Sequence, residues 1–415
     1  MKSNPVLLLA VAVAFPLSHL VSADWPQWRG PNRDDHSGDT GLLKQWPEGG
    51  PKLVWTNKDA GLGYSGCSIV GGTLYTLGAR DAVEYVVAID ANTGKEKWSA
   101  EAGALLTNGW GDGPRSTPTV AGGKVYTLSG KGQLSCFNTA DGKLVWKTTM
   151  EDAGGKVPGW GYTESPLVEG NLVVCTPGGA QGAIAAFDKV SGKKVWQSAD
   201  WTDPAQYSSI IAVDLNGARQ FIQLTMQSVG AVNAKDGSLL WKVPFPGKTA
   251  VIPTPIFNDG HVFVCAGYNV GAKLVKIGSG NKAEDLNPDM NPAMENHHGG
   301  VVLVDGHLYG HSNKGGWTCL DFKTGAVKWQ EQKALGKGAI HYADGQLYLL
   351  EEKTGTAALI DASPAGWKEH GRFTLTPQTT QRNPKGMVWT HPVVANGKLY
   401  LRDQELLFCF DVSGK

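Results

Sequence analysis

Residues 88–98 read Ala-Ile-Asp-Ala-Asn-Thr-Gly-Lys-Glu-Lys-Trp, and the pattern of this stretch returns along the chain. A small residue opens the motif, a glycine stands six residues later and a tryptophan ten residues later. Four further copies keep this spacing: Cys136–Trp146, Ala186–Trp196, Ala231–Trp241 and Cys319–Trp329. Three weaker copies lie near Lys276–Asn287, with Asn287 at the tryptophan position, at Leu359–Asp361 and at Cys409–Gly414. Seven steps cover the distance from Ala88 to Cys409, so one repeat takes about 46 residues.

A second element precedes each motif and has the pattern of a β-hairpin. Ser116–Tyr126 and Thr390–Tyr400 each combine an apolar strand, a glycine-containing turn and an alternating strand. The Asp-to-Gly part of the motif supplies a second hairpin turn. Four strands in each repeat predict an all-β, eight-bladed β-propeller of four-stranded antiparallel blades. Seven blades are the alternative if one degenerate copy is not a blade.

The two ends of the chain predict how the ring closes. The last copy stops before its tryptophan, whereas Lys52–Trp55 is a spare strand that carries one. We therefore expect this N-terminal strand to complete the C-terminal blade, which removes open sheet edges. The predicted organisation is a signal peptide at 1–23, an N-terminal extension at 24–49 and the propeller at 50–415.

Export is predicted from the beginning of the chain. Lys2 precedes a short apolar run from Val6 to Leu17, and Val21 and Ala23 stand at the −3 and −1 positions of a cleavage site after Ala23. No later apolar run is long enough to predict a transmembrane helix. We expect a periplasmic or extracellular protein of the cell envelope, and a monomer.

Composition excludes one broad class of function. Lys plus Arg (38) balance Asp plus Glu (38), so the chain lacks the positive charge that nucleic-acid binding requires. Glycine is abundant at 55 residues, as expected for many tight turns between short strands. The six cysteines form no Cys-x-x-Cys pair, and we interpret them as small buried residues rather than metal ligands.

The motif of Ala88, Gly94 and Trp98 resembles the tryptophan-docking motif of the pyrroloquinoline quinone (PQQ) repeat family. The resemblance implies that each tryptophan docks between neighbouring blades. The tryptophans with this predicted structural role are Trp55, Trp98, Trp146, Trp196, Trp241 and Trp329. The family includes PQQ-dependent dehydrogenases and also the propeller subunit of the outer-membrane β-barrel assembly machinery, which has no cofactor. The fold alone therefore does not settle function.

Departures from each branch of the family matter for the functional hypothesis. The adjacent Cys-Cys pair of soluble PQQ alcohol dehydrogenases is absent, and eight blades leave little chain for the insertions that roof their site. The assembly subunit is usually a lipoprotein, and no lipidation cysteine follows the predicted cleavage site.

A ligand site is predicted where the first strand of every blade enters the central channel. With the blades aligned, the innermost position holds small residues in seven repeats and His391 in the eighth. Two residues earlier, on the same strand face, the ring is larger, aromatic and cationic. Charge-assisted hydrogen bonds and stacking in such a mouth suit an anionic or planar ligand. The predicted ligand-binding residues are Tyr64, Arg115, Glu164, Tyr207, His298, Lys337, Trp389 and His391.

No catalytic or metal site is predicted with these residues. His297 and His298 are adjacent in a strand and should point to opposite faces, and a set of oxygen ligands for calcium cannot be assembled. The favoured hypothesis is a non-catalytic binding or scaffolding module with an unknown protein partner or a small ligand. The alternative is a PQQ- and calcium-dependent alcohol or sugar dehydrogenase.

Overall fold

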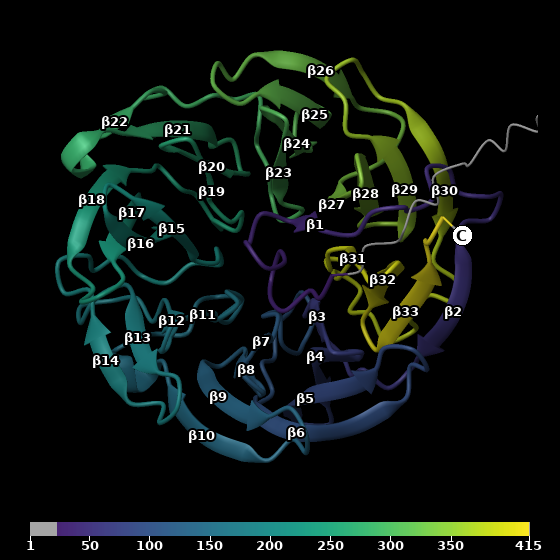
Figure 1. Cartoon of the computed structure of the whole chain (residues 1–415), viewed down its shortest axis with the longest axis horizontal. Helices are drawn as coiled ribbons and strands as arrows, with labels where there is room; N and C mark the ends of the chain where they lie inside the picture. The colour runs from purple at the N-terminus through teal and green to yellow at the C-terminus, as the bar shows by residue number, and fades with distance from the viewer. Residues whose placement is uncertain (1–22, 415) are drawn as a thin grey trace, which may run out of the picture.

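Eight antiparallel sheets form a closed ring in the computed structural model, which describes residues 23–414 (Figure 1). The eight-bladed, all-β prediction is confirmed, and the seven-bladed alternative is wrong. The predicted signal peptide lies, except for Ala23, outside the described residues. From the channel outward, the first four blades consist of β3 (Cys67–Val70), β4 (Thr73–Arg80), β5 (Val83–Asp90) and β6 (Glu96–Ala104); β7 (Thr119–Ala121), β8 (Lys124–Leu128), β9 (Gln133–Asn138) and β10 (Leu144–Thr149); β11 (Leu167–Glu169), β12 (Leu172–Cys175), β13 (Ala185–Asp188) and β14 (Lys194–Gln197); β15 (Ile211–Leu215), β16 (Ala218–Leu224), β17 (Ser228–Asn233) and β18 (Leu239–Pro244).

The other four blades follow the same order. They consist of β19 (Ile256–Asn258), β20 (His261–Ala266), β21 (Gly271–Ile277) and β22 (Ala283–Asp285); β23 (Val301–Val304), β24 (His307–Ser312), β25 (Gly316–Asp321) and β26 (Val327–Glu331); β27 (Gly338–Ala343), β28 (Gln346–Glu351), β29 (Thr356–Asp361) and β30 (Glu369–Thr374); β31 (Val393–Ala395), β32 (Lys398–Asp403), β33 (Leu406–Asp411) and β2 (Lys52–Asn57). The helices in residues 23–414 are the single 3₁₀ turns η1 (Glu151–Ala153) and η2 (Ser279–Asn281). Over that range the structure contains no helix with the length and apolar character needed to cross a membrane.

The N-terminal strand closes the ring as the sequence predicts. Strand β2 is the outermost strand of the eighth blade and pairs antiparallel with β33, with Trp55 opposite Cys409. Figure 1 shows the purple N-terminal strand beside the yellow C-terminal strands of this blade. The first and last parts of the chain thus share one sheet, which protects the edge that β33 would otherwise expose.

Docking tryptophans join neighbouring blades at three consecutive seams in the same way. Trp55, Trp98 and Trp146 donate indole Nε1–H bonds of 3.0 Å to Ala91, Thr139 and Lys189 of the next blade. Each indole ring also lies against the motif glycine of that blade. A Cβ on Gly94 would lie 2.6 Å from the Trp55 ring, and the φ of +70° at this position also favours glycine.

The other three docking tryptophans vary this arrangement. Trp196 lies against Gly237 of the next blade, although its buried Nε1 makes no hydrogen bond. Trp329 donates to the Ser363 carbonyl of the following blade at 2.8 Å. Trp241 instead donates to Gln220 within its own blade at 3.0 Å.

Two seams lack a docking tryptophan from the blade itself. Asn287 accepts a hydrogen bond from the Leu274 N–H in its own blade, and Asn291 donates to the Gly325 carbonyl of the next blade at 2.9 Å. In the seventh blade, Gly371 pairs with β29 at the tryptophan register, and Trp46 from the N-terminal extension fills the space.

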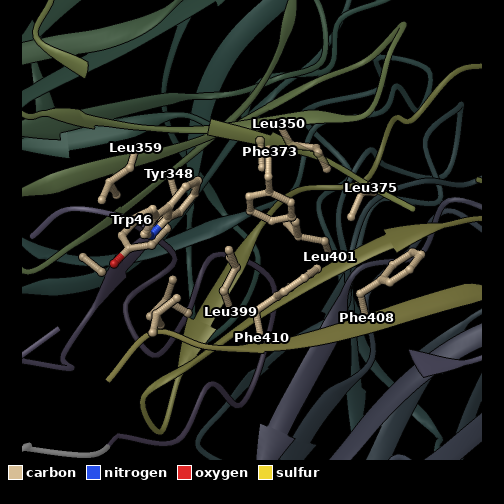
Figure 2. Packing of buried hydrophobic residues seen from close by; sticks show 14 of the residues in the cluster. Trp46, Tyr348, Leu350, Leu359, Phe373, Leu375, Leu399, Leu401, Phe408 and Phe410 are labelled. Carbon is tan, nitrogen blue, oxygen red and sulfur yellow. The ribbon is translucent and has the colours of Figure 1, made fainter. Parts of the chain in front are cut away.

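The seam between the seventh and eighth blades is therefore completed from outside both of them. Trp46 donates its backbone N–H to His370 at 2.8 Å and is 3% exposed. Figure 2 shows it beside Tyr348, with Phe373 and Phe410 in the same buried cluster. An N-terminal side chain thus supplies the aromatic burial that the repeat does not.

The N-terminal extension also enters the central channel, which the sequence did not predict. Residues 24–39, here called the channel segment, lie at the inner strands in the middle of the ring (Figure 1). Trp25 forms a bridge with Ile69 of β3, and β1 (His36–Ser37) pairs in parallel with β27. The Arg33 guanidinium donates to the carbonyls of Ser165, Pro166 and Ile210. This segment ties several blades together from within.

All six cysteines are buried and unpaired, in agreement with the sequence interpretation. Cys136, Cys319 and Cys409 each stand opposite a tyrosine of the neighbouring strand in their own blade. Burial raises the pKa of the Cys136 and Cys319 thiols to about 11, so they are neutral near pH 7.

Candidate functional site

A pocket of about 230 Å³ lies at the channel mouth, just before the inner strands begin. Residues from both predicted rings line it. Position 66 and its equivalents 165, 209, 254, 300 and 391 stand one layer deeper than position 64 and its equivalents 115, 163, 207, 252, 298 and 389. Because alternate residues of a strand share a face, both layers point inward together. The aromatic part of the wall comprises Trp28, Tyr64, Trp110, Trp160, Tyr207 and Trp389, with Tyr268 beside them.

Six of the eight sequence-predicted ligand residues lie on this wall. They are Tyr64, Arg115, Tyr207, His298, Trp389 and His391. Their convergence follows from the repeat, since equivalent positions of every blade face the same axis. Their role in binding a ligand stays a prediction.

Glu164 does not line the pocket. Its carboxylate accepts hydrogen bonds from the Thr176 hydroxyl at 2.7 Å and from Gln223 Nε2 at 3.1 Å, and also from the Thr176 N–H. The residue is 1% exposed, and burial raises the pKa of its carboxyl group to about 7. We expect Glu164 to join two blades rather than to contact a ligand.

Lys337 stands behind the wall, in a network centred on Glu352. The Glu352 carboxylate accepts from His298 Nε2 at 2.5 Å, from Trp389 Nε1 at 2.9 Å and from Lys337 Nζ at 3.0 Å. Burial favours the neutral acid, but the His298 hydrogen bond and the Lys337 charge outweigh it and lower the pKa of Glu352 to about 2. The ionised Glu352 fixes the orientation of two pocket side chains.

Lys337 also links this network to the far side of the pocket. Its Nζ lies 3.0 Å from Nδ1 of His297, whose Nε2 is 2.7 Å from the Tyr268 hydroxyl. Burial lowers the pKa of His297 to about 3, so this ring is a neutral acceptor near pH 7. His297 and His298 therefore have separate hydrogen-bond partners rather than a shared one.

Arg115 is the least compensated cation on the wall. Its guanidinium donates to the carbonyls of Gly113 and Gly111 at 2.8 Å each, and it lies 5.1 Å from the centre of the Tyr64 ring. Burial lowers the pKa of Arg115, but a guanidinium stays protonated near pH 7. Within residues 23–414 no carboxylate forms an ion pair with it. A partly desolvated positive charge without a counter-charge favours an anionic ligand.

His391 has partners within the protein itself. Its Nε2 donates to the His298 carbonyl at 2.9 Å, and its ring meets Trp28 edge-on at a centroid distance of 4.7 Å. Burial lowers the pKa of His391 to about 4, so the imidazole is neutral near pH 7. His391 contributes shape and polarity to the pocket, and Arg115 contributes the charge.

The floor of the pocket comes from the channel segment. Trp28 donates its Nε1–H to the Thr254 hydroxyl at 3.0 Å. Arg29 donates to the Val301 carbonyl at 2.7 Å and lies 3.3 Å from Asp35, which is 2.9 Å from His341. Asp35 thus balances Arg29, so the floor adds little net charge.

Sequence reasoning missed these floor residues and two wall tryptophans. Trp28 and Arg29 belong to no repeat, so alignment of the blades could not place them. Trp110 and Trp160 each stand in a Gly-Trp-Gly tripeptide in a loop before an inner strand. That recurring tripeptide is the signal that could have identified both residues.

The donor set of this pocket does not fit a calcium-held quinone. Calcium is bound by several oxygen ligands, usually with carboxylates among them. The pocket lining contains no Asp or Glu, and residues 23–414 contain no cluster of three or more His, Cys, Asp or Glu side chains suited to a metal ion. We therefore derive no oxidation step for this site.

Comparison with known proteins places the repeat in a family. A family model described as outer membrane protein assembly factor BamB matches residues 52–331. The chain belongs to this PQQ-like propeller family. The BamB protein of Yersinia pestis is 24% identical over 343 residues, which cover 79% of this chain and 69% of that protein.

Other similarities are shorter or concern the fold alone. The BamB protein of Nitrosomonas eutropha is 24% identical over 51% of this chain, which spans only 50% of that relative's length. The dehydrogenase subunit of a quinone-type alcohol dehydrogenase from Gluconacetobacter polyoxogenes is 30% identical over 161 residues, 36% of this chain and 21% of that protein.

Solved structures resemble the ring at low sequence identity. BamB from Moraxella catarrhalis has a TM-score of 0.58 at 14% identity, over 87% of this chain and 99% of that one. Quinohemoprotein alcohol dehydrogenase from Comamonas testosteroni has a TM-score of 0.61 at 14% identity, over 94% of this chain and 81% of that one. Both branches share the fold, so the likeness does not separate their functions.

Proposed function

We propose that this chain is a non-catalytic binding propeller of the cell envelope, with a small-ligand site at the channel mouth. The family match and the relatives named as outer membrane protein assembly factors support a binding or scaffolding role. The predicted signal peptide supports a periplasmic or otherwise exported location. A protein partner within an envelope assembly is part of the same proposal.

The single observation that carries the ligand proposal is the setting of Arg115. Its guanidinium is held by two loop carbonyls in an aromatic wall, without an ion-pair partner in residues 23–414. An anionic group would supply the missing counter-charge, and the surrounding rings would stack on a planar body. The ligand class is therefore a small planar anion.

Affinity for a matched pair of probes tests this proposal. We would titrate the purified protein with naphthalene-2-carboxylate and with its uncharged amide, using isothermal titration calorimetry. The carboxylate should bind more tightly, and its affinity should fall as salt is raised. Arg115→Ala should abolish this preference. Arg80→Ala, which removes an arginine paired with Glu96 on the outer part of a blade, is the control.

Two outcomes would contradict the proposal. Equal affinity for the acid and the amide would remove the electrostatic argument. An Arg115→Ala protein that folds normally and still prefers the carboxylate would place the site elsewhere.

A quinone-dependent oxidoreductase is the second candidate. It is favoured by the 30% identity to the quinone-type alcohol dehydrogenase subunit and opposed by the donor set of the pocket. Titration with PQQ and calcium, followed by cofactor absorbance and dye-linked alcohol oxidation, distinguishes the two. Calcium-dependent oxidation that is lost in Trp389→Ala would replace the binding proposal.

The predicted monomer and envelope location need separate experiments. Light scattering after size-exclusion chromatography should give the mass of one chain. Cell fractionation should place the processed protein outside the cytoplasm.

A further inference from the structure

Asp39 is a buried carboxylate at the end of the channel segment. It is 1% exposed and accepts hydrogen bonds from the Gly397 N–H at 2.7 Å and from the Ala23 N–H at 2.9 Å. Within residues 23–414, no lysine, arginine or histidine forms an ion pair with it. A buried ionised carboxylate without a cation is costly, because its lost hydration is only partly replaced by two neutral donors.

The charged groups that face Asp39 already have other partners. His341 is bonded to Asp35 at 2.9 Å, and Asp344 is paired with Lys44 at 2.7 Å. Burial raises the pKa of the Asp39 carboxyl group, and the negative charge of Asp344 acts in the same direction. The part of the ring described here therefore offers Asp39 no counter-charge of its own.

The chain lies against Asp39 at the place where the sequence predicts processing. The Ala23 nitrogen touches the carboxylate, and the predicted cleavage follows Ala23. Hydrolysis of the Ala23–Asp24 bond by a leader-removing peptidase consumes one water. It leaves a carboxylate on the released peptide and an α-ammonium group on Asp24. Consecutive Cα atoms are about 3.8 Å apart, so this ammonium forms within one residue of the Asp39 contact.

We propose that Asp39 is the binding site for the α-ammonium group of the mature chain, created by cleavage after Ala23. An α-amino group has an ordinary pKa of about 7.7–8.0 and is largely charged at pH 7. The ion pair replaces a neutral backbone donor with a cation at a carboxylate that needs one. Processing thereby tightens the attachment of the channel segment, and so of the pocket floor, to the Gly397 turn of the eighth blade.

The proposal predicts a coupling between the chain end and Asp39. We would export the protein with its own leader in two forms, one native and one with Gly-Ser-Gly inserted between Ala23 and Asp24. Both forms would be made in the wild-type, Asp39→Asn and Asp259→Asn backgrounds, and mass spectrometry would verify each N-terminus. Asp259 is the control because its side chain is 82% exposed on another blade.

The insertion should lower the midpoint of thermal unfolding in the wild-type and Asp259→Asn proteins. It should have no effect in Asp39→Asn. The ion pair raises the pKa of the ammonium, so its stabilisation is present below about pH 8 and is lost as pH rises through the folded-state pKa. An insertion that lowers the midpoint equally in all three backgrounds would overturn the proposal.

A second measurement keeps the test decisive if Asp39→Asn does not fold. The α-amine of the native protein should react at pH 7.5 about tenfold more slowly with an amine-labelling reagent than the same chain in denaturant, which corresponds to a one-unit rise in its pKa. Equal labelling rates in the folded and denatured chains would show that the ammonium is free. That result would also overturn the proposal, while leaving the pocket proposal untouched.

Discussion

Truncation of Trp146 tests whether the docking contacts hold the ring together. Its side chain is 8% exposed, lies against Gly192 of the next blade and donates a 3.0 Å hydrogen bond to Lys189. Truncating a buried tryptophan to alanine costs about 3–5 kcal/mol, and a hydrogen bond contributes about 1 kcal/mol to such a loss. We expect Trp146→Ala to lower the free energy of unfolding by about 4 kcal/mol.

The neighbouring Val145 provides the matched control. It lies on the same strand but is 43% exposed, so Val145→Ala should change stability by no more than about 0.5 kcal/mol. Asn287→Ala should also be mild, because Asn287 bonds within its own blade. Urea titrations followed by circular dichroism measure all three. If Trp146→Ala were as mild as Val145→Ala, the docking argument would be refuted.

Three further predictions concern closure, charge and pH. Deleting residues 24–57 removes the closing strand and the channel segment, so the midpoint of thermal unfolding should fall far more than on removal of the signal peptide alone; unchanged stability would exclude the closure model. Arg115→Ala combined with His391→Ala should leave the circular dichroism spectrum intact and abolish binding of the carboxylate probe; retained affinity would move the site to the outer loops. The pKa of Glu352 is about 2 in the folded protein, below its ordinary value, so Glu352 stabilises the fold above about pH 4.5 and this contribution is lost as pH falls toward 2. The stability difference between wild type and Glu352→Gln should therefore shrink between pH 7 and pH 3, and a constant difference would contradict this account.

Much of the pocket wall could be predicted because the ring repeats. Once one inner strand is placed, equivalent residues of every blade face the same axis, and the period of two selects the side chains that point inward. Tyr64, Arg115, Tyr207 and Trp389 follow from that rule. Glu164 does not, because its strand neighbour Ser165 points into the channel while Glu164 points between blades.

The repeat motif by itself determined the number of blades, their strand order and the strand that closes the ring. Its spacing records contacts that recur locally in every blade, so one chain contains several copies of the same information. Only the tertiary structure placed the channel segment, the insertion of Trp46 at Gly371 and the partners of Glu352 and Asp39. These contacts join single residues far apart in sequence and occur once each, so no periodic pattern records them.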